Sequence, residues 1–303
     1  MNRFFAWLPT TVDARVRFMA WTTFVVQTLI VVTGGAVRLT ASGLGCPTWP
    51  QCTADSLVTT PEMGWHGVIE FGNRLLTFVL VIVAIAAFVL ILRMRKQRRD
   101  LFWLTLLIGL GIPAQAIIGG ISVLMKLDPY IVGLHFVVSG ALVAASTVFV
   151  YRVYRGNAPT QWLVPWKLFG FLRLIVGAAA FEVITVLLGI LLTGSGPHAG
   201  DANAPRNGLN SLFVQSVHTY IAFAALVMVI IGCVIAFRNQ WTSLAKALLA
   251  LIVINVAQII VGLAQANLGL PELLVGLHML LACLVIAAAT LALLNLRKPA
   301  LTP

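Results

Sequence analysis

The chain has 303 residues, of which 60% are hydrophobic and 10% are charged, and its mean hydropathy is +1.00. A soluble protein of this length needs a much larger charged surface, so the composition excludes an ordinary soluble domain. The net charge of +11 would suit nucleic-acid binding, but the positions of the cations along the chain indicate a membrane topology instead.

Eight apolar segments are each long enough to cross a bilayer core of roughly 30 Å as a helix. A helix satisfies its own backbone hydrogen bonds, which lipid cannot do, so we expect an all-α integral membrane fold with eight transmembrane helices. In chain order the predicted spans are Phe18–Val37, Gly67–Leu92, Leu101–Leu124, Tyr130–Tyr151, Phe169–Leu192, Leu212–Phe237, Leu244–Ala266 and Glu272–Leu296. No small-residue cleavage motif follows the first span, which we expect to be retained.

The cations lie mainly on one side of these spans. If the N-terminus is inside, 16 of the 20 lysines and arginines, from Arg3 to Lys298, fall on the inner side. The other four are Arg38, Arg74, Lys126 and Arg206. Because cytoplasmic loops of membrane proteins are enriched in Lys and Arg, we expect both termini in the cytoplasm and no nucleic-acid partner.

An internal repeat divides the chain into two halves. Ala114–Thr147 aligns without a gap on Ala257–Thr290, with 12 identities in 34 positions. The shared landmarks are Ala114-Gln115 with Ala257-Gln258, Gly119 with Gly262, and Val132-Gly133-Leu134-His135 with Val275-Gly276-Leu277-His278. We therefore expect two tandem four-helix bundles, residues 1–155 and 156–303, related by a pseudo-two-fold axis along the membrane normal.

Three of the five histidines lie at one depth. His135, His218 and His278 each stand about six residues inside the outer end of an even-numbered span, on the order of 9 Å below the boundary. Asn73 occupies the corresponding depth in the second span. Polar residues in lipid are costly and usually functional, and imidazole is the usual axial ligand of haem iron. The alternative is that these are structural histidines bonded to neighbouring helices.

These features together resemble the heme A synthase family, whose members convert haem O to haem A for cytochrome oxidase. The resemblance covers essentially the whole chain and includes the first-loop stretch from Gly34 to Cys46 and the segment from Ile69 to Arg74. The third outer loop, from Thr193 to Asp201, has an actinobacterial form. The resemblance implies an oxidoreductase in a bacterial cell membrane, with its haem sites towards the outer face.

The family resemblance also implies roles for individual residues. The C-terminal half would hold a haem b cofactor between His218 and His278, and the N-terminal half would bind the substrate haem O with His135 on its iron. The reaction would oxidise a porphyrin methyl group to a formyl group. Glu70 matches the carboxylate that the family needs for activity and would handle protons; the alternative is a boundary carboxylate paired with Arg74. The pathway implies a heme O synthase and cytochrome oxidase assembly factors as partners.

Asn73 departs from the family pattern, which usually has a second histidine at this position. A carboxamide is a weak ligand for haem iron. Either the substrate iron is five-coordinate on His135, or His66 replaces the missing ligand from roughly 10 Å higher on the same helix. We expect the open, five-coordinate site.

Two cysteines and one acidic residue complete the candidates. Cys46 and Cys52 lie in an outer loop in an oxidising compartment, so we expect a disulfide, either redox-active as in the resembled family or purely structural. Cys233 and Cys283 lie within helices and are expected to pack as small apolar residues. Glu182 lies deep in a span, where we expect either a proton path or a buried partner.

Two other functions compete with the enzyme. A diheme electron-transfer cytochrome is permitted by the histidines alone, but Asn73 argues against it because an electron carrier benefits from two closed, bis-ligated haems. A transporter with histidine-lined paths predicts polar residues deep in several helices, whereas those of this chain cluster near the outer edge.

Overall fold

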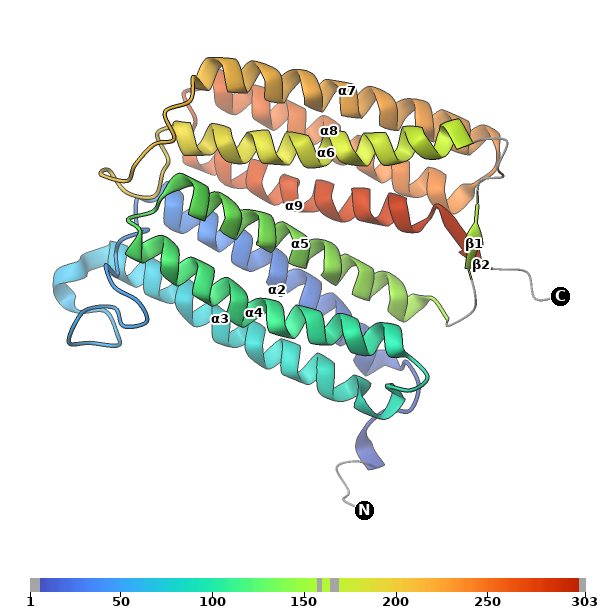
Figure 1. Cartoon of the computed structure of the whole chain (residues 1–303), viewed down its shortest axis with the longest axis horizontal. Coiled ribbons are helices and arrows are strands. Elements are labelled where there is room, and N and C mark those ends of the chain that lie inside the picture. Colours follow the sequence, from blue (N-terminus) through green and yellow to red (C-terminus); the bar gives the residue numbers. More distant parts are fainter. Residues whose placement is uncertain (1–5, 157–159, 164–168, 300–303) are drawn as a thin grey trace. The chain divides into compact units, whose positions relative to one another are not determined.

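The computed structural model describes residues 6–156, 160–163 and 169–299, and eight long helices account for most of them (Figure 1). Each is long and apolar enough to cross a membrane, and each coincides with a predicted span, so the all-helical prediction is confirmed. The helices are α2 (Ala14–Leu39), α3 (Gly64–Ile91), α4 (Arg99–Leu124), α5 (Pro129–Tyr154), α6 (Phe169–Ser195), α7 (Ser211–Arg238), α8 (Thr242–Asn267) and α9 (Glu272–Leu294). Arg3 and Lys167, two cations expected on the inner side, lie outside the described residues.

Polar caps determine where three of these helices begin. Asp13 before α2, Asp128 before α5 and Asn210 before α7 each accept a hydrogen bond from a backbone N–H of the first turn. Pro129 at the first position of α5 has no N–H to satisfy. These caps supply acceptors for N–H groups that have no partner within the helix.

A short antiparallel sheet was not expected from the sequence. Strand β1 (Thr160–Trp162) pairs with β2 (Arg297–Pro299), with Gln161 opposite Lys298. Each strand has three residues, which is too short for an alternating pattern to be recognised.

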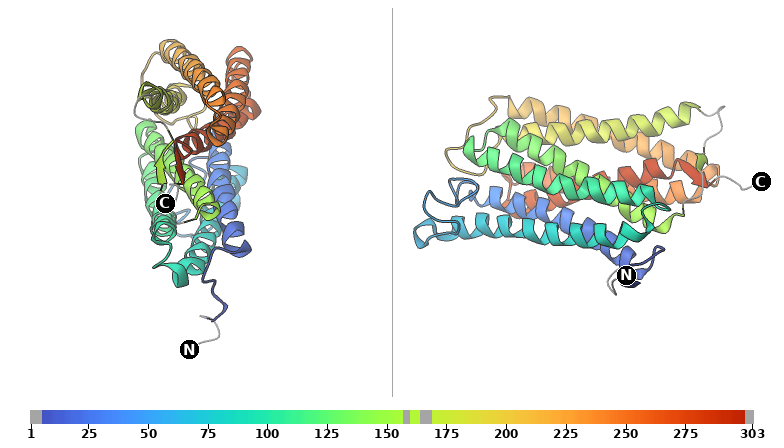
Figure 2. Two further views of the ribbon diagram at one scale, coloured as in Figure 1. Left: turned by 90° about the vertical axis from the view of Figure 1, so that its right-hand side faces the viewer. Right: turned by 60° about the horizontal axis from the view of Figure 1, so that its bottom comes forward.

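The chain divides into two compact units, Met1–Gly156 with Ile190–Leu209, and Asn157–Gly189 with Asn210–Pro303. In the first unit the four helices form a closed ring. Along the chain α2 packs against α3, α3 against α4 and α4 against α5, and α5 packs back against α2. Figures 1 and 2 show these four helices running alongside one another. In the second unit α8 packs against both α7 and α9.

Residues 190–209 lie in the second half expected from the repeat, which begins at residue 156, but they belong to the first unit. The Arg38 guanidinium at the end of α2 donates to the carbonyls of His198 (2.7 Å) and Thr193 (3.1 Å). The N–H of Gly43 donates to the carbonyl of Gly200 (2.8 Å). The segment is therefore bonded to the loop that follows α2.

The densest apolar packing lies at the ends of the helices that are far from the histidines. In the first unit Val16, Ile91, Leu101 and Phe149 are fully buried there. The second unit has a corresponding cluster. It includes Phe171, Ile175, Val229, Ala236, Leu244 and Leu248.

The opposite ends of α8 and α9 are packed more loosely. The buried residues of α8 end at Asn255, and those of α9 begin at Cys283. The half of this helix pair that carries His278 therefore contains no fully buried residue.

Candidate functional site

His218 of α7 and His278 of α9 face each other within the second unit. Their ring centroids are 6.5 Å apart and the ring planes are inclined by 59°. A metal–imidazole bond is about 2 Å long, so with roughly 1 Å from each nitrogen to its ring centre, two imidazoles that ligate one iron lie about 6 Å apart. The separation of the two rings therefore fits one haem iron held between them.

The hydrogen bonds of the two rings also fit metal binding. Nδ1 of His218 lies 2.9 Å from the Thr185 carbonyl oxygen, which can only accept, so Nδ1 carries the hydrogen and Nε2 is left as a ligand. Metal-bound histidines commonly donate their second N–H to a carbonyl in this way. Nδ1 of His278 is buried and has no hydrogen-bond partner among the described residues.

A glycine on the preceding helix faces each of these histidines. A Cβ atom added at Gly189 of α6 would lie 3.3 Å from Cε1 of His218. One added at Gly262 of α8 would lie 2.9 Å from Cε1 of His278. Any larger residue would press on the imidazole, so the glycines set the space in which each ring lies.

His135 of α5 has the same surroundings in the first unit. A Cβ atom at Gly119 of α4 would lie 3.2 Å from its Cε1. The Gln115 side chain, also on α4, donates to the His135 carbonyl (3.1 Å) and to the Ser139 hydroxyl (2.5 Å). Nδ1 of His135 is buried without a hydrogen-bond partner among the described residues.

Asn73 of α3 is already bonded within its own bundle. Its Oδ1 accepts a hydrogen bond from the Thr33 hydroxyl of α2 (2.8 Å). Its Nδ2 is 4.0 Å from the position of a Cβ at Gly34. This hydrogen bond holds the Asn73 side chain against α2.

His66, the alternative ligand, lies in the first turn of α3 and is exposed. Its Nδ1 is 3.0 Å from the Ser42 hydroxyl oxygen. This contact ties the start of α3 to the loop after α2.

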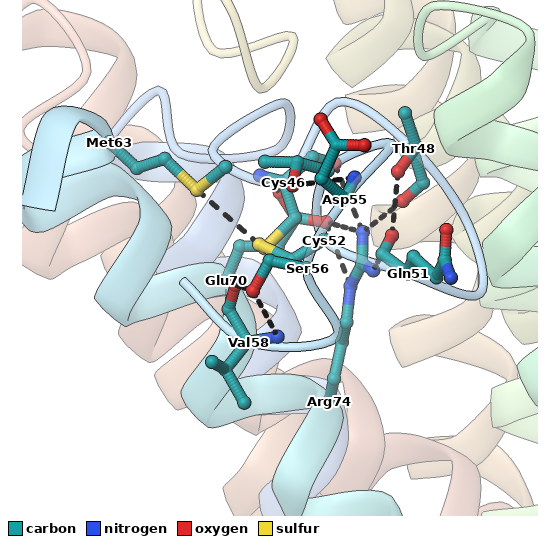
Figure 3. Close-up of a disulfide and its surroundings, with 11 residues drawn as sticks. Cys46, Thr48, Gln51, Cys52, Asp55, Ser56, Val58, Met63, Glu70 and Arg74 are labelled. Atoms are coloured by element: carbon teal, nitrogen blue, oxygen red, sulfur yellow. Dashed lines mark hydrogen bonds and ion pairs between the residues drawn. A yellow bond between two sulfur atoms is a disulfide. The ribbon is translucent and has the colours of Figure 1, made fainter. Parts of the chain in front are cut away.

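Glu70 of α3 is buried beneath the first loop, with 5% of its surface exposed, and three N–H groups bond to its carboxylate (Figure 3). Oε2 accepts from the Cys46 N–H at 2.5 Å. Oε1 accepts from Nε and Nη2 of Arg74, at 3.1 and 2.5 Å. The Arg74 pairing considered from the sequence is therefore present, and the carboxylate also holds the loop.

The Arg74 guanidinium connects this ion pair to the disulfide loop. It donates to the carbonyls of Cys46 and Thr48, both at 3.0 Å, and to that of Gln51 at 3.3 Å. The predicted disulfide between Cys46 and Cys52 is confirmed. Met63 Sδ lies 3.4 Å from Cys52 Sγ, so the methionine sulfur packs against the disulfide (Figure 3).

The disulfide loop also contacts the helix that carries Gly119. A Cβ atom at Gly120 would collide with the indole ring of Trp49, so this ring lies directly against α4. Gly119 and Gly120 thus make room for two different rings, those of His135 and Trp49.

Sequence reasoning missed several of these contacts. Thr33 and Trp49 carry no recognisable motif, because their partners are far away in the chain. Gly119 and Gly262 did appear as landmarks of the repeat, but their contact with the histidines was not predicted. Cys233 and Cys283 are buried and free, as expected.

Comparison with known proteins identifies the family of the chain. The COX15-CtaA family model, described as a cytochrome oxidase assembly protein, matches residues 17–290. A heme A synthase of Geobacillus kaustophilus (strain HTA426) is 25% identical over 162 residues, which cover 53% of this chain and 50% of the relative. One of Lysinibacillus sphaericus (strain C3-41) is 34% identical over 148 residues, covering 46% and 47%. The chain spans about half the length of the relatives that it matches.

Substituting the glycines that face the histidines should expel the ligand. Overpacking costs about 1–3 kcal/mol, so Gly189→Val and Gly119→Val should each weaken haem binding roughly 5- to 150-fold. The measurement is haem content by absorbance after purification in detergent. The controls are Gly170→Val in α6 and Gly109→Val in α4, where a Cβ would meet nothing within 4 Å. Equal losses in control and test variants would contradict the assignment.

Removing Arg74 should release the disulfide loop. Arg74→Gln leaves the Glu70 carboxylate, whose side chain is 7% exposed, without its cation, and breaking such a pair costs about 3–5 kcal/mol. We expect a lower unfolding temperature and faster proteolysis within residues 46–62. The exposed Arg99 provides the control variant Arg99→Gln, which should behave like the wild type.

Proposed function

The chain belongs to the COX15-CtaA family of cytochrome oxidase assembly proteins, and on that basis we propose that it is a heme A synthase. It would oxidise a methyl group of haem O to a formyl group. The observation that carries the proposal is the difference between the two units: two facing imidazoles in one, and one imidazole with an amide at the corresponding level in the other.

The second unit is suited to a permanently bound haem b. His218 and His278 would hold the haem iron between them. When bound, this haem supplies one-electron transfer. Thr185 fixes the orientation of His218 by accepting its Nδ1 hydrogen.

The first unit is suited to the substrate haem O. His135 would hold the iron on one side, backed by Gly119. Asn73, which is held by Thr33, would contribute little to holding the iron, because a carboxamide is a weak ligand for haem iron. This supports the five-coordinate alternative rather than ligation by the exposed His66.

Glu70 would have the catalytic role that the family resemblance implies. Oxidation of a methyl group to a formyl group removes protons from the carbon, so a nearby carboxylate is useful as a proton acceptor. To take a proton, Glu70 would exchange the Cys46 N–H or one of the Arg74 hydrogen bonds. The acid–base group would thus be coupled to the disulfide loop.

The topology and partners follow from the same proposal. The protein would lie in a bacterial cell membrane with both termini in the cytoplasm and the haem sites towards the outer face. Haem O would arrive from a heme O synthase, and haem A would pass to assembly factors of cytochrome oxidase.

Haem extraction tests the proposed function. The protein is co-expressed with a heme O synthase and purified, and its non-covalent haems are separated by chromatography. In the wild type we expect haem b together with haem O or haem A. In His278→Ala we expect haem b to be lost while the farnesylated haem is kept. Haem b without any farnesylated haem would instead favour an electron-transfer cytochrome, and no haem at all would exclude both functions.

A second axial ligand in the first unit should change the substrate site. Asn73→His introduces the imidazole that the family usually has at this position, so bound haem O should become six-coordinate and low-spin. Asn73→Ala should keep the five-coordinate spectrum. Electron paramagnetic resonance and visible spectra distinguish the two states. A six-coordinate spectrum in the wild type that persists in Asn73→Ala and disappears in His66→Ala would show that His66 is the ligand.

A further inference from the structure

Glu182 is buried at the midpoint of α6. It lies 13 residues from each end of the helix (182 − 169 and 195 − 182), and 5% of its surface is exposed. A carboxylate at such a depth in a membrane is costly and is retained mainly where it has a function. The proposed reaction at Glu70 does not use it, because Glu70 belongs to the other unit.

The partner of Glu182 is an equally buried amide. Asn255, 6% exposed, lies near the midpoint of α8, and its Nδ2 donates to Oε1 of Glu182 at 2.6 Å. Glu182 forms no ion pair within the part of the chain that the structure describes. One neutral hydrogen bond leaves the second carboxylate oxygen available to bind a proton.

Each residue of the pair stands at the same sequence interval from a glycine that faces a candidate haem ligand. Glu182 is seven residues before Gly189, the glycine against His218. Asn255 is likewise seven residues before Gly262, the glycine against His278. Seven residues are two helical turns, so each side chain of the pair lies on nearly the same helical face as its glycine and about 10 Å deeper.

Of the two carboxyl groups on these helices, Glu182 is the one that is buried. Glu272, the other carboxyl, is exposed at the start of α9. The ionisable side chains on the four helices, besides Glu182, are Arg173 on α6, His218, Tyr220, Cys233 and Arg238 on α7, Lys246 on α8, and Glu272, His278 and Cys283 on α9. Cys233 donates to the Ala245 carbonyl, and Cys283 is buried as a free thiol.

We propose that Glu182, held by Asn255, takes up a proton when an electron reaches the haem centre between His218 and His278. This inference rests on the proposed function. Reduction removes one positive charge from the centre, and protonation removes one negative charge from Glu182. One electron and one proton therefore enter together and the net charge of the region does not change, which is favourable in a medium of low dielectric constant.

The proposal predicts a pH-dependent potential for the bound haem b. The holoprotein is titrated in detergent between about pH 6 and 9, with dithionite as electron donor and small redox mediators. In the wild type the midpoint potential should fall by up to about 59 mV for each tenfold decrease in proton concentration. In Glu182→Gln the dependence should be largely lost, while haem content and the visible spectrum stay unchanged.

Glu182→Gln separates proton uptake from a structural role. The glutamine carbonyl can still accept the Asn255 hydrogen bond, so a purely structural pair would tolerate the change. Glu272→Gln is the matched control, since it removes an exposed carboxylate from the same unit and should leave the pH dependence intact.

Three outcomes would overturn the proposal. They are a pH-independent potential in the wild type, an unchanged pH dependence in Glu182→Gln, and loss of haem b from Glu182→Gln, which would show a structural role. Failure of the proposed function has a different signature, because the wild type would then contain no haem b or form no haem A.

Discussion

A polar side chain inside an apolar helix bundle costs several kcal/mol unless a partner or a ligand takes its hydrogen bonds. In this chain most such groups have partners: Glu70 binds three N–H groups, Glu182 one amide, and His218 a carbonyl. Within the described residues, the buried Nδ1 atoms of His135 and His278 are among the exceptions. Binding of a haem iron at the other ring nitrogen, Nε2, would offset the cost of keeping these imidazoles in the membrane.

Stability and ligand binding occupy different ends of the bundles. The large buried side chains, such as Phe149 and Leu244, lie at the ends far from the histidines. At the histidine ends, glycines take the positions that a core would fill with larger residues. Close packing is intolerant of added volume, so the two requirements are easier to meet in separate regions of each helix. This division explains why the loosely packed half of α8 and α9 is the half that carries His278.

The two units use similar surroundings for different chemistry. In each, glycines face the candidate ligands, but Asn73 stands where the second unit has His218. One changed side chain would leave one iron open and the other closed. The disulfide loop, with Glu70 and Arg74 beneath it, is found over the unit with the open site. Glu182 and Asn255 lie in the other unit, where they would compensate charge.

The sequence alone determined the eight helices, because hydrophobic length is a local property, and it predicted the level of the candidate ligands from the repeat and from helical periodicity. It also predicted the Cys46–Cys52 disulfide from two nearby residues. Only the tertiary structure decided which groups meet across helices: Thr33 with Asn73, Trp49 with Gly120, and Asn255 with Glu182. It also showed that residues 190–209 pack with the first unit. Such pairings depend on the rotation and register of whole helices, which no short stretch of sequence encodes.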